Sequence, residues 1–362
     1  MKVLHVLGQL DIGGLECWLK DFVFFSMKRT SISHSVVIER EKIGELEHEF
    51  KSLGVSIIRV TPSKKSKIKY LKDIYNVLKK DKYDIVHSHV SFTSGYINFI
   101  SFLVGVNGRL THIHSDRSKL LNSSGVFRRL HIYFSLFLIE VFSNSKIAVS
   151  KNAAEVLLKI KKVHIIPCGK HFQDFHHVKT DKTKFLSALS WNENDIVLCS
   201  IGRLEKVKNH VFIINLLQSL SSEYKYLIIG DGSERKAIES IVQKLGLEER
   251  VSLLGSRSDA LYVLDKVCDI FLFPSLHEGL GLAAVEAQYY GIPSVISKNV
   301  PLEVVIANDV RVVGLDEPNV WLEKILELDK KGRDRGYIEK IKSKFSIQSN
   351  VERIIDIYEK YV

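Results

Sequence analysis

The chain has 362 residues, 45% of them apolar and 26% charged, a composition that excludes a disordered chain and fits a folded protein with a full core. This length exceeds what a single core usually supports, so two domains are expected. The formal net charge is +10, and residues 1–175 carry the whole excess, with 27 Lys and Arg against 15 Asp and Glu. Such asymmetry indicates an anionic surface or ligand on the first half, although solvated lysines explain it equally well. The sequence has no zinc-finger, helix-turn-helix or RNP pattern, so no nucleic-acid partner is expected.

Cysteine usage and apolar patterning favour a cytoplasmic protein. The four cysteines lack C-x-x-C spacing and stand in or beside apolar runs, which predicts buried free thiols in a reducing compartment. Residues 1–6 have a strand pattern and lack the apolar stretch and cleavage site of a signal peptide. The most apolar window, Val90–Val106, is interrupted by Ser, Thr, Asn and Gly and is a poor membrane span.

In the first half, short apolar strands alternate with longer helical patterns, which predicts a parallel sheet covered by helices. The expected strands are 2–8, 34–38, 56–60, 84–89, 109–114, 146–149 and 164–166. The expected helices are 15–27, 70–80, 127–142 and 151–160. The run Pro167–Lys170 interrupts this pattern, so the linker between the domains is placed from there to about His176.

The second half repeats the alternation. Its expected strands are 195–201, 226–230, 251–254, 270–273, 294–296 and 310–312, and its expected helices are 211–220, 235–245 and 282–290. A last helix is expected over 345–362, with Ile354, Ile355 and Tyr358 on its apolar face. Because ligands of open parallel sheets bind beyond the carboxyl ends of the strands, the informative residues should follow strands.

The strongest pattern is a strand, a Gly-containing loop and a helix over residues 273–287. The backbone N–H groups and the positive dipole end of a helix starting near Gly281 suit a phosphate. Glu278 lies in the loop and Glu286 lies in the helix, so the two carboxylates can hold vicinal hydroxyls of a sugar and a ribose. The alternative is that Glu278 caps the helix and Glu286 is a surface residue.

Glu278, seven intervening residues and Glu286 resemble the E-x7-E signature of retaining GT-B glycosyltransferases, specifically the large family 4. Pro274-Ser275, Glu278-Gly279-Leu280-Gly281 and Glu286-Ala287 match this family as well, and the resemblance covers nearly the whole chain. It implies an α/β protein of the GT-B fold, with two Rossmann-like parallel-sheet domains facing across a cleft. The first expected domain is 1–170, which faces the acceptor and on which helix 345–362 packs back. The second is 176–344, which binds the nucleotide sugar.

Cations and glycines that follow strands in the second half fit the same resemblance. Arg203 and Lys208, after the strand that ends at Gly202, are similar to the family's G-R-x(n)-K-N-H segment, in which Arg and Lys hold the leaving diphosphate. Lys206 is the alternative to Lys208. Gly230 follows the next strand and can approach a ligand closely, and Arg257 lies in the segment that the family places near the base. The expected donor-binding residues also include Gly279, Leu280, Gly281 and Leu282.

In the first half, Gly13 and Gly14 resemble the family's G-G-x-E start, whose glycine loop approaches the donor. His114 matches the position of an active-site histidine near the donor sugar, which makes His114, Glu278, Arg203 and Lys208 the expected catalytic set. The H-x-H pairs His87/His89 and His112/His114 also permit zinc, but without a supporting Cys or carboxylate pattern no metal and no cofactor is expected. His87 and His112 are expected in the core, with backbone hydrogen-bond partners.

The resemblance implies transfer of a sugar from a nucleoside-diphosphate sugar, expected to be a UDP-sugar, to a glycan or polyprenyl-linked acceptor, with retention of configuration, in bacterial surface polysaccharide synthesis. Two alternatives stay open: a GT-B sugar-nucleotide epimerase, and a catalytically silent, glycan-binding partner subunit. The basic stretch 64–72 and helix 127–142, with Arg128 and Arg129, suggest peripheral contact with the inner face of the plasma membrane. A buried helix with a basic end is the alternative.

Overall fold

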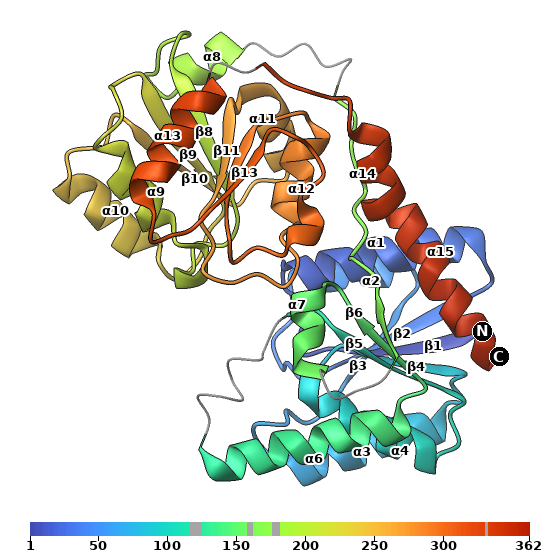
Figure 1. Ribbon diagram of the computed structural model, residues 1–362. Coiled ribbons are helices and arrows are strands. Elements are labelled where there is room, and N and C mark those ends of the chain that lie inside the picture. The colour runs from blue at the N-terminus through green and yellow to red at the C-terminus, as the bar shows by residue number, and fades with distance from the viewer. Residues whose placement is uncertain (116–124, 158–161, 176–181, 330–331) are drawn as a thin grey trace. The chain divides into compact units, whose positions relative to one another are not determined.

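The computed structural model describes residues 1–115, 125–157, 162–175, 182–329 and 332–362 (Figure 1). It divides into two compact units, Met1–His171 with Lys344–Val362, and Phe172–Ser343. His176, the expected end of the linker, lies outside the described residues, as do residues 158–160 of the expected helix 151–160.

Unit 1 contains a seven-stranded sheet in the order β3-β2-β1-β4-β5-β6-β7, with every pairing parallel. Its strands are β1 (Lys2–Val6), β2 (Ser33–Ile38), β3 (Ser56–Arg59), β4 (Ile85–Ser88), β5 (Gly108–Ile113), β6 (Ser145–Ala148) and β7 (Val163–Ile165). Helices cover both faces of such a sheet, which is why nearly all residues of β1, β2, β4, β5 and β6 are buried.

Two groups of helices cover the sheet of unit 1 (Figure 1). On one face lie α3 (Lys67–Lys80), α4 (Ser94–Leu103) and α6 (Val126–Phe142), and on the other lie α1 (Gly14–Arg29) and α15 (Ile347–Tyr358). The described part of this unit also contains the short helices α2 (Glu47–Ser52) and α7 (Lys151–Ala154). Helix α3 shows how the sequence determines these helices. Ser66 caps its first turn, and Tyr70, Ile74 and Leu78 form its buried stripe.

Unit 2 contains a six-stranded parallel sheet in the order β10-β9-β8-β11-β12-β13. Its strands are β8 (Ile196–Ile201), β9 (Tyr224–Ile229), β10 (Val251–Gly255), β11 (Ile270–Phe273), β12 (Ser294–Ser297) and β13 (Val310–Val313). Its helices are α8 (Lys182–Ser187), α9 (His210–Leu217), α10 (Arg235–Lys244), α11 (Ala260–Val267), α12 (Leu282–Tyr289) and α13 (Pro318–Asp329), and α14 (Ile338–Phe345) leads back to unit 1. One core cluster joins the sheet to α9, α10 and α13 through Ile213, Val242 and Trp321.

The C-terminal helix belongs to unit 1. Ser346 caps α15, so the expected helix begins at Ile347, and residue 345 belongs to α14. Ile354, Ile355 and Tyr358 are buried, as the apolar face predicted. The Trp18 indole donates to Asn350 Oδ1 at 2.9 Å, which ties α15 to α1.

Both sheets have the doubly wound order in which the first strand lies between the second and the fourth. The predicted fold class, α/β with two Rossmann-like parallel-sheet domains, is therefore confirmed. None of the described helices combines the length and apolar character that crossing a bilayer requires.

Candidate functional site

Three of the predicted residues of unit 2 lie at the point where its strand order reverses. β8 and β11 are neighbours in the sheet, yet their chains continue to opposite sides. Open α/β sheets bind ligands in the crevice at the carboxyl ends of such strands. The loop after β8 carries Arg203 and Lys208, and the loop after β11 carries Glu278.

Lys208 and Glu278 form an ion pair across these two loops. Lys208 Nζ donates to Glu278 Oε1 at 2.6 Å, with the side chains 19% and 12% exposed, and it stands 5.0 Å from the Phe273 ring centroid. Backbone contacts hold the loops together, since Leu276 N donates to Val207 O at 2.8 Å. A cation and a carboxylate are thereby held at the edge of the sheet, where a ligand that carries both anionic and hydroxyl groups can meet both.

Glycines allow the loops at this edge to pack closely. A Cβ atom at Gly230 would overlap the carbonyl oxygen of Gly202. A Cβ atom at Gly202 would lie 3.2 Å from Lys208 Cε. Both glycines follow strands, as predicted, and they support the shape of the Lys208 loop.

Helix α12 places the second predicted carboxylate. Glu286 is buried, with 5% of its surface exposed, so the alternative of a surface residue is wrong. Glu278 does not cap the helix either: the N-cap is Gly281, with φ +95° and no side-chain cap bond. Leu280 and Gly281 are buried, and Gly279 and Leu282 are partly exposed beside them.

The other cations considered for the donor site lie at the surface of unit 2. Arg203 and Lys206 are exposed on the β8–α9 loop. Arg257 is also exposed, and its guanidinium donates to both carboxylate oxygens of Asp259 at 2.7 and 2.8 Å. His210 follows Lys208, and burial together with the Lys208 charge lowers the pKa of its imidazole to about 4.

In unit 1, Gly13 is the N-cap of α1 and Gly14 its first residue, as the glycine start predicted. His114 follows β5, is partly exposed, and lies 3.0 Å from His89 (Nε2 to Nδ1). Burial in the protein lowers the pKa of His114 to about 3, so its imidazole is neutral.

His87 and His112 lie in the core, as expected, but their hydrogen-bond partners are side chains and not the backbone. His87 Nε2 lies 3.2 Å from His112 Nδ1, and His87 Nδ1 lies 2.5 Å from the Tyr358 hydroxyl. The expectation of backbone partners is wrong because α15 brings Tyr358 onto this face of the sheet.

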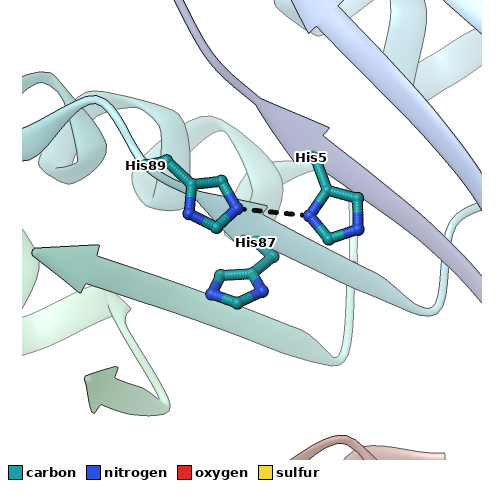
Figure 2. A group of neighbouring side chains, drawn as sticks. All are labelled: His5, His87 and His89. Atoms are coloured by element: carbon teal, nitrogen blue, oxygen red, sulfur yellow. Dashed lines mark hydrogen bonds between the residues drawn. The ribbon is translucent and has the colours of Figure 1, made fainter. Parts of the chain in front are cut away.

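Sequence reasoning missed His5 and His34, which join the two H-x-H pairs on the same face of the sheet. His5 pairs in register with His87 across β1 and β4 (Figure 2). The sequence did contain a signal for this cluster. The H-x-H spacing predicts that both histidines of a pair point to one face of the sheet, because side chains alternate along a strand.

A cavity of about 320 Å³ lies at the opposite edge of the unit 2 sheet, beside the amino ends of β8 and β11. Lys182, Asp195 and Asp269 line it, and none of the predicted site residues does. Lys182 and Asp269 form an ion pair at 2.7 Å, so charge within the wall is already compensated.

Residues 181–344 match the family described as Glycosyl transferases group 1. The chain is 26% identical to EpsF of Bacillus subtilis over 99% of this chain and 96% of EpsF, which is named as a glycosyltransferase. It is 28% identical to the capsular polysaccharide biosynthesis glycosyltransferase CapH of Staphylococcus aureus, over 83% of this chain and 82% of CapH. It is 27% identical to an Escherichia coli UDP-Gal:alpha-D-GlcNAc-diphosphoundecaprenol alpha-1,3-galactosyltransferase, over 80% of this chain and 79% of that enzyme.

Among solved structures, the chain is similar to Anabaena HepE in complex with UDP, with a TM-score of 0.78, 18% identity and coverage of 99% of this chain and 100% of HepE. It is similar to the lipopolysaccharide biosynthesis glycosyltransferase WaaG with a TM-score of 0.74, 17% identity and coverage of 98% and 99%. These likenesses place the fold with the GT-B glycosyltransferases. The second unit thus matches the glycosyl transferases group 1 family, and the relatives that align over most of the chain are named as glycosyltransferases.

Proposed function

We propose that the protein transfers a sugar from a UDP-sugar to a lipid-linked glycan acceptor, with retention of anomeric configuration, in the synthesis of a bacterial surface polysaccharide, as a family 4 enzyme. The relatives named for capsule and diphosphoundecaprenol acceptors support the pathway and the acceptor class. The HepE complexes with UDP and UDP-glucose support the base.

The observation that carries the proposal is the Lys208–Glu278 pair at the switch point of unit 2, with buried Glu286 on the helix that follows. In the free protein the pair neutralises two partly buried charges. When the donor binds, Lys208 and Arg203 stabilise the negative charge of the departing diphosphate, and Glu278 turns to the sugar hydroxyls. Glu286 holds the ribose. The loop glycines Gly202, Gly230, Gly279 and Gly281 let backbone N–H groups approach the phosphates.

The other predicted residues are expected to contribute less to donor binding, or to contribute only after their side chains move. Gly13, Gly14 and His114 of unit 1 are assigned to the sugar side of the donor. Arg257 must leave Asp259 to reach a base, so its backbone is the better contact. No metal is assigned to the donor diphosphate, because Arg203 and Lys208 supply its positive partners.

We also propose that unit 1 docks on an anionic membrane through the outer face of α6. Apolar side chains at helical spacing are exposed along it, Phe127 by 90%, and opposite them Ile132, Leu138 and Ile139 are buried. The exposed apolar residues of α6 are Val126, Phe127, Leu130, Tyr133, Phe134, Phe137 and Val141.

A basic rim adjoins this apolar stripe. Arg128 and Arg129 are exposed on α6 itself. Burial lowers the pKa of His131 on α6, and the charge of Lys67, at the start of α3, lowers it further, so the basic stretch 64–72 begins near α6. An apolar stripe bordered by cations is the pattern of helices that lie in a lipid interface. Such docking would bring the protein to its lipid-linked acceptor.

The test is incubation of the purified chain with a panel of UDP-sugars and a short-chain polyprenyl-diphosphate sugar, with proton NMR of the product's anomeric centre. Transfer with the anomeric configuration of the donor is the expected result. Turnover of donor to a new UDP-sugar without acceptor would identify an epimerase instead. Donor binding without turnover on any acceptor would identify a silent subunit.

A further inference from the structure

We propose that unit 1 binds a divalent metal ion such as Zn²⁺ through His89, His112 and His114. The proposal concerns unit 1 alone and does not rest on the proposed function. Six histidines from four adjacent strands and their ends meet on the face of the sheet that α1 and α15 cover. Figure 2 shows three of these rings, His5, His87 and His89, facing one another. The six are His5, His34, His87, His89, His112 and His114.

These imidazoles are neutral. Burial is the largest cause in each case and lowers the pKa of all six, to about 3 for His34 and His114. A neutral imidazole has one N–H donor and one lone pair, and the lone pair is what a metal ion needs.

A chain of hydrogen bonds from Ser26 orders the protons of His34, His5 and His89. The Ser26 hydroxyl donates to the carbonyl oxygen of Val23 at 2.9 Å, so its oxygen accepts from His34 Nε2. His34 Nδ1 then accepts from His5 Nε2 at 3.0 Å. His5 Nδ1 in turn accepts from His89 Nε2 at 3.2 Å, the dashed line in Figure 2. His89 is thereby left with a lone pair on Nδ1.

Three nitrogens gather at the end of this chain. His89 Nδ1 lies 3.0 Å from His114 Nε2. His112 Nε2 is fully buried and has no hydrogen-bond partner among the described residues. A buried polar atom without a partner is costly in a protein interior. The three residues each offer a ligand nitrogen, all within 4.8 Å of one another, so small ring rotations bring them to one ion.

The opposite ring nitrogens already have the partners that a metal site requires. His89 Nε2 contacts His5, and His112 Nδ1 contacts His87 at 3.2 Å. His114 Nδ1 lies 3.5 Å from the Cys168 thiol. Metal-bound histidines commonly use the second nitrogen in this way, which fixes ring orientation. The His114 proton must move from Nε2 to Nδ1, and His112 binds through Nε2 when its own proton is on Nδ1, with His87 then donating to the Tyr358 hydroxyl; no proton leaves the site.

A second group, His5, His87 and His89, also falls within 4.8 Å, but it is the poorer candidate. Both nitrogens of His87 are already engaged, with Tyr358 and with His112. Binding there would break one of these contacts and would leave His112 Nε2 without a partner. His114 is also partly exposed, which gives the preferred group a route to solvent.

Three neutral imidazoles suit Zn²⁺ and its neighbours and not Mg²⁺, which prefers oxygen. With an ion bound, His114 Nε2 is committed to the metal. The role proposed for His114 beside the donor sugar then belongs to the metal-free form.

The experiment uses the full chain, stripped with a chelator and dialysed. Zn²⁺ is titrated in competition with a chromophoric chelator, and Co²⁺ is added separately to record its visible spectrum. We expect one equivalent of Zn²⁺ and intense tetrahedral Co²⁺ bands. His112→Phe should weaken Zn²⁺ binding by at least about 100-fold. The matched control is His210→Phe, a buried histidine of unit 2 whose partner is Tyr226.

Absence of micromolar Zn²⁺ binding by the wild type, or unchanged binding by His112→Phe, would overturn the proposal. Equal loss in His210→Phe would show that the effect is general destabilisation and would also overturn it. If His112→Phe does not fold, X-ray absorption of the zinc-loaded wild type decides: three imidazole nitrogens at about 2.0 Å support the site, and fewer exclude it.

Discussion

Lys208 Nζ and Glu278 Oε1 lie 2.6 Å apart although 70 residues separate them in the chain. The pair exists because β8 and β11 are neighbours at the switch point of the unit 2 sheet. In the free protein each charge is the other's partner, and a donor diphosphate would compete with Glu278 for Lys208.

We predict that Lys208→Ala lowers kcat/KM about 100- to 1000-fold, because the departing diphosphate loses a positioned cation. Steady-state kinetics with the active UDP-sugar measures this. Lys206→Ala, an exposed lysine on the same loop, is the control and should change the rate less than about twofold. A larger effect at Lys206 than at Lys208 would reassign the diphosphate contact.

Glu286→Ala should weaken donor binding by about 1–3 kcal/mol, the cost of a lost hydrogen bond to a ribose hydroxyl. Calorimetric titration with UDP reports it, since UDP carries the ribose and lacks the sugar. Glu248→Ala, an exposed carboxylate of the same unit, is the control. Unchanged affinity in Glu286→Ala would remove this residue from the donor site.

We predict that transfer continues in excess EDTA without added Mg²⁺ or Mn²⁺, because Arg203 and Lys208 are the proposed charge partners of the diphosphate. The rate is compared with and without chelator, and zinc content is measured in both samples, so that ion loss from the histidines is scored separately. Loss of activity that Mn²⁺ or Mg²⁺ restores would place a metal at the donor.

The stability of unit 1 should fall in mild acid. Burial lowers the pKa of His34 to about 3, against 6.5 for the unfolded residue, so the unfolded chain binds the extra proton. The contribution is fully present above pH 6.5 and is lost as the pH falls from 6.5 toward 3, by about 1.4 kcal/mol per pH unit. Urea unfolding of chelator-treated protein at pH 7.5 and 5.5 measures it. His34→Gln should show a smaller difference between the two pH values than the wild type, and an equal difference would contradict the assignment.

Flotation with anionic liposomes tests the membrane surface. The wild type should float at low salt and be released near 1 M salt, where the screening length is about 3 Å. Charge reversal of Lys64, Lys65, Lys67 and Lys69 to Glu should release it, as should the double change Phe127→Ser and Phe134→Ser. The matched control reverses four exposed lysines of unit 2: Lys184, Lys236, Lys244 and Lys298. If the wild type does not float with anionic liposomes at low salt, the docking proposal is wrong.

Local patterns predicted much of this molecule. The strand, glycine loop and helix around Glu278 could be recognised because each feature depends on neighbours within about fifteen residues. The Lys208–Glu278 pair could not, since it depends on which strands adjoin in the sheet. Arg257 was assigned from the family resemblance, which places its segment near the base, but Asp259 two residues later holds its side chain. The histidine cluster was seen only as two separate pairs because its union needs β1, β4 and β5 side by side.

Helix α15 completes unit 1 with residues that follow the whole of unit 2 in the chain. Trp18 has Asn350 as its indole acceptor, and His87 has the Tyr358 hydroxyl. Until α15 has been synthesised, after the whole of the second unit, the nascent first unit lacks these partners, so we expect it to complete folding only once the second unit is already made. A fragment that stops at residue 171 should therefore fail to accumulate as a native protein. Chimaeras between relatives should exchange the first unit and the final helix together.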